Sequence, residues 1–211
     1  AVFNTRGGSG KSAATVFLAD FLSSTFKKRV LIVDLDPQRS SSVALLGEER
    51  VDAELAEGKC LATLLHKTVD ENPEATDARS ILMERPPGQG RGRTTYLGPV
   101  SVMSGSRQYW KALDARLDAL ALRDGRRGHS VLKTILKPLQ RDFDICLIDF
   151  PAHETGPITK NGLRAARWWI FPCVPDRSGS RDIEGPVEAF LEACQGTKHR
   201  PQGLGTLLSI C

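Results

Sequence analysis

The feature that most constrains this chain is a glycine-rich turn near its start, Arg6–Ser12 (RGGSGKS). Residues 1–4 before the turn are typical of the end of a strand, and residues 11–25 after it carry apolar side chains at helical spacing. Glycines let backbone N–H groups converge on an anion without clashes from Cβ atoms, and a helix that begins there adds its positive end. The sequence therefore predicts a strand–turn–helix unit that binds phosphate groups.

The side chains of this turn suit a nucleotide with Mg²⁺. Lys11 can reach the β- and γ-phosphates, and the Ser12 hydroxyl can ligate Mg²⁺. The usual pattern G-x-x-x-x-G-K-[ST] requires glycine where this chain has Thr5, whereas the variant with a basic residue before G-G-x-G-K-[ST] fits. The residues predicted to bind the nucleotide are Gly7, Gly8, Ser9, Gly10, Lys11, Ser12 and Ala13.

Aspartates follow two apolar runs that are typical of buried parallel strands. Asp34 ends the run at 29–34 and Asp36 follows two residues later, while Asp149 ends the run at 144–149. Ligands of a doubly wound sheet bind beyond the carboxyl ends of its strands, so we expect these carboxylates near the glycine turn. There they suit a hydrated Mg²⁺ and the positioning of a water on the γ-phosphate. The simpler alternative for Asp34 and Asp36 is a polar strand exit with an Asx-type turn before Pro37.

Strands and helices alternate along the rest of the chain. We predict further strands at 100–103, 168–174 and 204–211, helices at 61–65, 109–122, 130–140 and 183–193, and loops at 70–77 and 85–93, the last flexible and basic. This alternation implies βαβ crossovers. The expected fold class is α/β, a doubly wound, mostly parallel sheet with helices on both faces in three layers.

The size and composition fit one globular domain. The 211 residues predict a single domain over 1–211, and because the chain starts and stops inside apparent strands we expect it to be truncated at both ends. Hydrophobic residues make up 40% and charged residues 26%, which argues against wholesale disorder. No apolar run approaches the roughly 20 residues of a membrane span. Five cysteines without a Cys-x-x-Cys pair argue against disulfides and favour the cytoplasm.

These motifs together resemble the ParA-type partition ATPases, which belong to the deviant Walker A, ParA/MinD-like group of P-loop ATPases. The matching segments are Asn4–Ser12, Val30–Ser42, Phe143–Pro151 and Ala166–Gly185. The resemblance implies ATP and Mg²⁺ as cofactors, a homodimer that forms on ATP binding, ATP-dependent binding of nonspecific DNA, and slow hydrolysis stimulated by an adaptor or ParB-like protein. Such a cycle positions plasmids, chromosomes or other cargo on the bacterial nucleoid.

The resemblance also implies roles for single residues. Lys11 corresponds to the phosphate lysine, Asp36 would orient the attacking water, and Ser12, Asp34 and Asp149 would support the metal. The family usually has a lysine where this chain has Arg6, and that lysine reaches the partner's nucleotide. Arginine and lysine are not interchangeable at phosphates. Arg6 would therefore act on the second copy's nucleotide, weaken hydrolysis while keeping dimerisation, or be a solvated loop cation.

Basic residues outside the turn are candidates for DNA contact. The formal net charge is +4, from 29 Lys and Arg against 25 Asp and Glu. Phosphate contacts need cations but no base-specific geometry. The candidates are Arg126, Arg127, Arg164 and Arg167. The alternative for each cluster is a solvated charged face.

Three other functions share these motifs. One is a metabolic ATP-dependent enzyme of the same superfamily, similar to cobyrinic acid a,c-diamide synthase, which would need an added substrate or glutaminase domain. Another is a MinD-like membrane-associated positioning ATPase, which would need an amphipathic terminal helix. The third is a nucleotide-binding module in which Arg6 no longer supports turnover.

Overall fold

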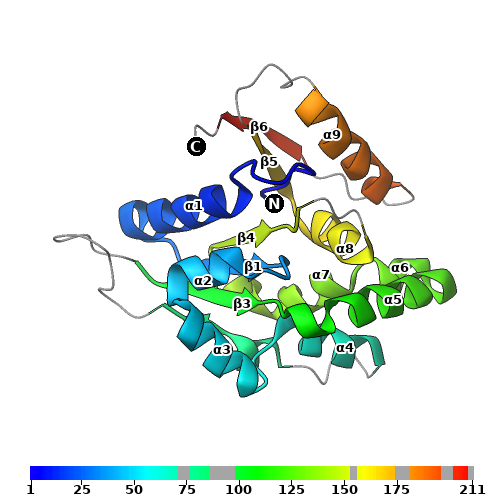
Figure 1. Ribbon diagram of the computed structural model, residues 1–211, viewed down its shortest axis with the longest axis horizontal. Coiled ribbons are helices and arrows are strands. Elements are labelled where there is room, and N and C mark those ends of the chain that lie inside the picture. Colours follow the sequence, from blue (N-terminus) through cyan, green and yellow to red (C-terminus); the bar gives the residue numbers. More distant parts are fainter. Residues whose placement is uncertain (71–76, 86–97, 153–155, 174–180, 196–201, 209–211) are drawn as a thin grey trace.

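A computed structural model of the chain describes residues 1–70, 77–85, 98–152, 156–173, 181–195 and 202–208. The helices are α1 (Lys11–Phe26), α2 (Ser40–Leu46), α3 (Glu48–Ala56), α4 (Leu61–Asp70), α5 (Arg107–Arg123), α6 (Gly125–Gly128), α7 (Val131–Leu136), α8 (Pro157–Ala165) and α9 (Arg181–Cys194), with 3-10 turns η2 (Ala78–Ile81) and η3 (Lys137–Arg141). The strands are β1 (Val30–Asp34), β2 (Met83–Glu84), β3 (Val100–Ser104), β4 (Ile145–Asp149), β5 (Trp168–Cys173) and β6 (Gln202–Leu208). Figure 1 shows their arrangement.

The sheet is mostly parallel. Its larger part has the order β2-β3-β1-β4, with β1 parallel to β3 and β4 and only the short β2 antiparallel. β5 and β6 form a second parallel pair. Between β4 and β5 lies the start of the chain, where Val2 bridges to both Asp149 and Ile170. The first strand expected at residues 1–4 is therefore reduced to isolated bridges that join the two pieces of sheet.

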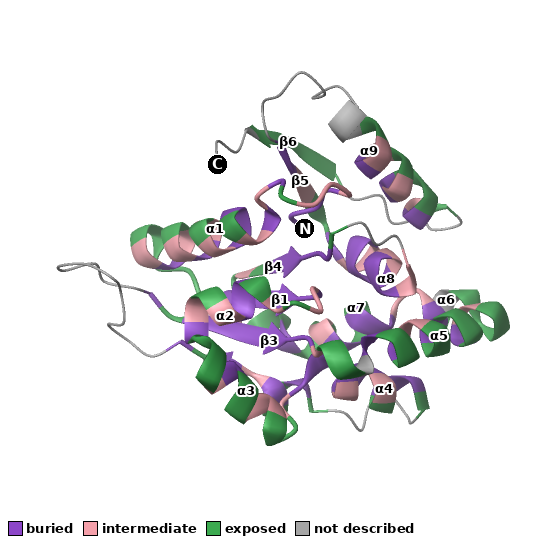
Figure 2. Ribbon diagram, viewed as in Figure 1, coloured by how far each residue is buried: buried purple, intermediate pink, exposed green. Residues whose placement is uncertain are grey.

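Two layers of helices enclose β1, and this explains its uninterrupted apolar run. Leu31 and Val33 face the core shared with α4, α5, α7, α8 and α9, whereas Val30 and Ile32 face the core shared with α1, α2 and α3. Every residue of β1 is buried, as expected for a parallel strand covered on both faces. Figure 2 shows the strands β1 and β3 buried between helices whose outer faces are exposed. The α/β three-layer prediction is confirmed.

Most predicted elements appear, with different bounds. The helix expected at 61–65 continues to Asp70, and the one expected at 130–140 divides into α7 and η3, with Pro138 at the start of the 3-10 turn. The strands at 29–34, 100–103 and 144–149 are present. The expected strand at 204–211 lies at 202–208 within the described chain, and residue 174 falls outside it. Helices α2, α3, α6 and α8, the 3-10 turn η2 and strand β2 were not predicted.

The basic loop predicted at 85–93 lies outside the described residues except for Arg85, whose side chain is fixed within the fold. Arg85 is only 6% exposed, although a loop cation was expected. Its guanidinium forms an ion pair with Asp20 of α1 and donates a hydrogen bond to the Gly98 carbonyl at 2.6 Å. A buried charge needs such partners, so Arg85 fixes β2 to α1 instead of facing a ligand. Likewise, the loop predicted at 70–77 lies outside the described residues at 71–76, while Asp70 ends α4.

No helix in the described part of the chain is both long and apolar enough to cross a membrane.

One charged pair ties the starts of β1 and β4 together. The Asp144 carboxylate accepts hydrogen bonds from the Arg29 backbone N–H and from its guanidinium, each at 2.9 Å. Hydrogen bonding by Arg29 lowers the pKa of Asp144 to about 2. Because this pKa lies below the value in an unfolded chain, the pair stabilises the fold above about pH 4 and loses its effect as the pH falls towards 2.

We therefore expect Asp144→Asn to be slightly less stable than the wild type near pH 6, and we expect the difference to be clearly smaller near pH 2, where about half of the folded protein carries a protonated Asp144. Urea unfolding at the two pH values measures the difference. A stability gap that stays constant with pH would show that the charge of Asp144 plays no part.

Candidate functional site

The glycine turn has the backbone that its sequence predicts. Gly8 and Gly10 have φ angles of 71° and 80°, in the left-handed region that residues with a Cβ rarely adopt. Gly10 is the N-cap of α1 and brings no side chain to cap the helix. The first N–H groups of an α-helix lack partners within the helix, so the start of α1 is suited to bind an anion.

Lys11 is turned inward onto the same loop. It is 6% exposed, and its Nζ donates a hydrogen bond to the Arg6 carbonyl at 3.0 Å, where the Ser9 hydroxyl also donates at 3.0 Å. Burial lowers the pKa of Lys11, and the carboxylates of Asp149 and Asp36 oppose that change. The ammonium thus rests on a neutral carbonyl inside a partly apolar site. A phosphate would be a stronger, charge-assisted acceptor at the same place.

Two buried carboxylates stand beside the turn. The register of the parallel ladder pairs Asp34 with Asp149, and both residues are fully buried. Burial, together with the charge of Asp149, raises the pKa of Asp34 to about 7, and burial is also the main cause of a raised pKa for Asp149. Like charges this close are unfavourable in a dry environment. A cation between the strand ends would relieve that cost.

The oxygen atoms of Asp149 fit a hydrated Mg²⁺. One carboxylate oxygen, Oδ1, is buried and has no hydrogen-bond partner, and the other accepts from the Ser41 hydroxyl. The Ser12 hydroxyl is also close enough to this carboxylate to lower its pKa. Oxygen ligands, water and phosphate are the usual shell of Mg²⁺. The described residues hold no cluster of three His, Cys, Asp or Glu side chains, so such an ion would depend on phosphate and water for the rest of its shell.

Asp34 has a different environment from Asp149. Its Oδ1 accepts from the Asp36 backbone N–H at 3.1 Å, and its Oδ2 accepts from the Ser42 backbone N–H at 2.9 Å and the Ser42 hydroxyl at 2.7 Å. Both oxygens are thus engaged within the protein. Asp34 holds the segment that carries Asp36 and fixes the start of α2, which suits a positioning residue better than a direct metal ligand.

Asp36 lies at the mouth of the site. It is half-buried, and its Oδ1 accepts from the Gln38 backbone N–H at 2.9 Å while its Oδ2 accepts from the Ser40 hydroxyl at 3.3 Å. The first of these bonds is an Asx turn, the simpler alternative for this segment. The turn and the catalytic role are compatible, because the turn fixes the carboxylate next to Lys11.

Sequence reasoning assigned no role to three residues that shape the site. Ser41 and Ser42 bind the two buried carboxylates, and Asn4 accepts a hydrogen bond from the Arg6 backbone N–H at 2.8 Å. Ser41 and Ser42 come seven and eight residues after Asp34, so their place shortly after that strand end was the available signal. Asn4 gives no such signal, because its partner in β5 is distant in sequence.

The four arginines predicted to contact DNA are in different environments. Arg164 is half-buried and donates to the Ala193 and Gln195 carbonyls, which fixes it to the end of α9. Arg127 reaches the Val69 carbonyl at 3.5 Å. Arg167 is exposed and lies over the Trp168 ring at 5.4 Å, and the Arg126 side chain is outside the described residues. Of the side chains described, Arg167 is the most suitable for a phosphate backbone.

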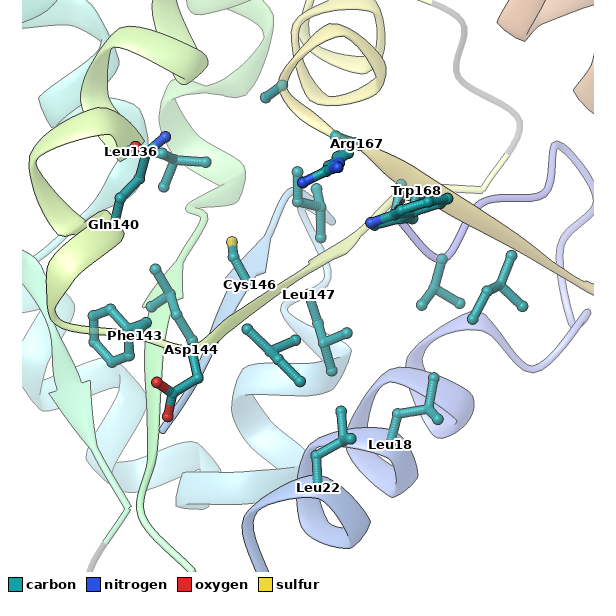
Figure 3. Close-up of a pocket in the computed structure, with 18 of the residues that line it drawn as sticks. Leu18, Leu22, Leu136, Gln140, Phe143, Asp144, Cys146, Leu147, Arg167 and Trp168 are labelled. Carbon is teal, nitrogen blue, oxygen red and sulfur yellow. Dashed lines mark hydrogen bonds between the residues drawn. The ribbon is translucent and has the colours of Figure 1, made fainter. Parts of the chain in front are cut away.

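An apolar cavity of about 670 Å³ lies at the other end of the sheet. Figure 3 shows Leu18 and Leu22 of α1 on one side of it, Phe143 and Leu136 on another, and Cys146 of β4 between them. Cys146 is solvent-accessible where it faces this cavity, and the surrounding protein desolvates its thiol and raises the thiol pKa to about 12. The cavity surrounds the beginnings of β4 and β5, whereas Lys11, Asp34 and Asp149 stand at the strand ends. It is therefore separate from the phosphate-binding turn.

A left-handed glycine turn at a helix start, a buried lysine and an aspartate at the end of a neighbouring parallel strand define a P-loop nucleotide-binding protein. A sequence model of the "CobQ/CobB/MinD/ParA nucleotide binding domain" matches residues 1–196. The chain belongs to this family, and the predicted ParA-type resemblance is confirmed. It is a P-loop ATPase, and the prediction of ATP and Mg²⁺ as cofactors agrees with this membership.

Two curated relatives cover nearly the whole chain. The chromosome-partitioning ATPase Soj of Thermus thermophilus is 26% identical over 211 residues, which are 100% of this chain and 68% of Soj. The maintenance of carboxysome distribution protein A of Synechococcus elongatus is 29% identical over 202 residues, 95% of this chain and 68% of that protein.

Solved structures share the fold. Apo McdA of Cyanothece has a TM-score of 0.74 at 21% identity and covers 98% of this chain, which covers 70% of McdA. Cobyrinic acid a,c-diamide synthase of Mycobacterium smegmatis with a bound ATP analogue and magnesium has a TM-score of 0.73 at 25% identity. The match covers 98% of this chain and 72% of the synthase. The pNOB8 ParA bound to nonspecific DNA has a TM-score of 0.65 at 20% identity, and the match covers 98% of this chain and 66% of pNOB8 ParA.

We expect Lys11→Ala to abolish ATP binding, because the substitution removes the cation predicted for the β- and γ-phosphates. Isothermal titration with ATP–Mg²⁺ measures the effect, and Lys133→Ala, an exposed lysine beside the apolar cavity, is the control. Unchanged ATP affinity in the Lys11 variant would reject the site.

We expect Asp36→Ala to bind ATP within about threefold of the wild type and to hydrolyse it about 100-fold more slowly, because it loses the group that orients the attacking water. Asp77→Ala is a matched control, since Asp77 also accepts from a backbone N–H two residues on, at 2.9 Å, far from the turn. Steady-state phosphate release measures both. Equal turnover in the Asp36 variant and the wild type would remove Asp36 from this role.

Proposed function

We propose that this chain is an ATP-driven dimeric switch of the ParA type that partitions or positions cargo through ATP-dependent binding to nonspecific DNA. The observation that carries the proposal is the gathering of Lys11, Asp36 and Asp149 beside the left-handed glycine turn, in a chain whose curated relatives include a chromosome-partitioning ATPase. The cargo is a plasmid, a chromosome or another large assembly, and the protein acts in the bacterial cytoplasm on the nucleoid.

The residues of this chain would divide the work of the site. The N–H groups of Gly7–Ser12 would bind the phosphates, with Lys11 moving from the Arg6 carbonyl to the β- and γ-phosphates. Ser12 and Asp149 would hold Mg²⁺, which neutralises charge on the phosphates, and Asp34 would hold the Asp36 segment in place. Asp36 would then orient a water in line with the γ-phosphate.

Dimerisation is the step that would couple ATP binding to DNA binding. Two copies that bind ATP face to face would place Arg6 of one copy near the nucleotide of the other. Arginine binds phosphate in a planar, bidentate way, so it can replace the usual lysine as an arginine finger. An adaptor or ParB-like partner would stimulate slow hydrolysis and separate the copies.

Two observations support the proposal of DNA binding: an exposed arginine and a structure of similar fold that contains DNA. Nonspecific affinity comes from cations near phosphates, and Arg167 is an exposed arginine of the described part of the chain. One protein with the same fold, pNOB8 ParA, has been solved bound to nonspecific DNA. Cobyrinic acid a,c-diamide synthase shares the fold with a similar TM-score, but the curated relatives favour partition. That metabolic enzyme and a MinD-like positioner are therefore weaker proposals.

The wild type should be retained on nonspecific duplex DNA with ATP–Mg²⁺ and not with ADP–Mg²⁺ at physiological salt, because only the ATP-bound dimer presents two basic surfaces together. Arg167→Ala should weaken retention severalfold. It should also reduce the slope of log affinity against log salt concentration by about one, the value for one lost phosphate contact. Arg50→Ala on α3 is the control, since Arg50 pairs with Glu54.

Retention with neither nucleotide would overturn the DNA-based switch and favour a metabolic or membrane-positioning function. Equal retention with ATP and ADP would exclude the switch and leave only a basic surface. Lys11→Ala tested alongside shows whether nucleotide binding is required.

A further inference from the structure

Asn4 is a buried polar residue whose contacts the ATP-binding mechanism does not use. It is fully buried, immediately before the glycine turn. Its side-chain Nδ2 donates to the Pro172 carbonyl in β5 at 2.8 Å, and its Oδ1 accepts from the Arg6 backbone N–H at 2.8 Å. A buried amide left without partners is costly, so this pair of bonds fixes its orientation.

These bonds continue into the phosphate loop. The Arg6 residue whose N–H donates to Asn4 also carries the carbonyl that accepts from Lys11 Nζ and from the Ser9 hydroxyl. The order is therefore Pro172, Asn4, Arg6 and Lys11, from the end of β5 to the phosphate lysine. A shift of the Asn4 amide would move the Arg6 backbone and, with it, the acceptor that holds Lys11.

The start of the loop also lies close to α9. A Cβ built on Gly185 of α9 would lie 3.1 Å from the Thr5 hydroxyl oxygen, so a larger residue there would crowd Thr5. In the described chain, the β5–β6 pair joins the larger sheet through Val2 and its neighbours. Asn4 thus lies between the two pieces of sheet and the phosphate loop.

We propose that Asn4 is a positioning residue that sets the phosphate loop in register with the end of β5. Its carboxamide holds the Arg6 backbone so that the loop N–H groups and Lys11 converge on one place. The inference rests on the ATPase function of the chain, because it assigns Asn4 a role in the affinity for the phosphates and not only in stability. Asn4 acts through Arg6 and Lys11 and not by contact with the nucleotide.

The test compares Asn4→Ala with Asn161→Ala. Asn161 is also a buried asparagine, bonded to the Gly128 carbonyl at 2.8 Å and the Pro157 carbonyl at 3.1 Å, but it lies on α8 away from the loop. Both variants should lower Tm, since each removes buried hydrogen bonds. Only Asn4→Ala should raise KM for ATP–Mg²⁺, by about tenfold, because misplacing a positioned group weakens phosphate contacts.

Asn4→Ser is the second variant, for the case in which Asn4→Ala does not fold. A serine hydroxyl is too short to reach both Pro172 and Arg6, so KM should again rise severalfold. Amide hydrogen exchange over residues 5–10 should speed up in either Asn4 variant and not in Asn161→Ala. KM equal to the wild type in a folded Asn4 variant would overturn the proposal and leave Asn4 a structural residue. A wild type that does not bind ATP would instead reject the ATPase function itself.

Discussion

Asp34 and Asp149 are buried side by side at the ends of adjacent parallel strands, and the surrounding groups are arranged to make that tolerable. Burial and mutual repulsion raise the pKa of Asp34 to about 7. Hydrogen bonds from Ser41 and Ser42 and the nearby charge of Lys11 favour the ionised forms. Such a site has a deficit of positive charge, which a divalent cation on the free oxygen of Asp149 would correct.

The topology explains why these groups meet. Parallel pairing of β1 with β4 aligns the strand ends residue by residue, so two aspartates that are far apart in the chain become neighbours. Residues 1–3 lie between β4 and β5, which brings the glycine turn to the same edge. Ligand chemistry at the carboxyl edge of an open α/β sheet is a general consequence of this arrangement. The two helix layers supply the buried environment, and the glycine turn supplies the backbone donors.

Much of this site could be predicted from local patterns in the sequence. The glycine turn, the buried strands and their terminal aspartates follow from backbone sterics and from period and position, so the α/β fold and the meeting of Lys11 with Asp149 could be predicted. The environments of the arginines could not. Arg85 pairs with Asp20, and Arg164 binds the end of α9, through contacts between distant segments. From the sequence alone, both arginines resemble free surface cations, because the sequence gives their charge but does not show which distant residue pairs with it.

Contacts that the sequence does not show also distinguish the role of Asp34 from that of Asp149. Both end an apolar run, and the sequence predicts a metal role for each. In the structure Asp34 uses both oxygens to hold the Asp36 and Ser42 backbone, while Asp149 keeps one oxygen without a partner. Asn4 shows a further limit, since its partner Pro172 is 168 positions away in the chain. Side-chain roles that depend on such contacts need the fold.

We infer that nucleotide phosphates bind at the glycine turn, beside the two strand-end carboxylates. A crystal structure of the chain with a non-hydrolysable ATP analogue and Mg²⁺ tests this most directly. We expect the phosphates on the N–H groups of residues 7–12, Lys11 Nζ moved from the Arg6 carbonyl onto the phosphates, and the ion beside Ser12 and Asp149. A nucleotide bound in the apolar cavity between β4 and β5, or Lys11 still on the Arg6 carbonyl with nucleotide present, would contradict it.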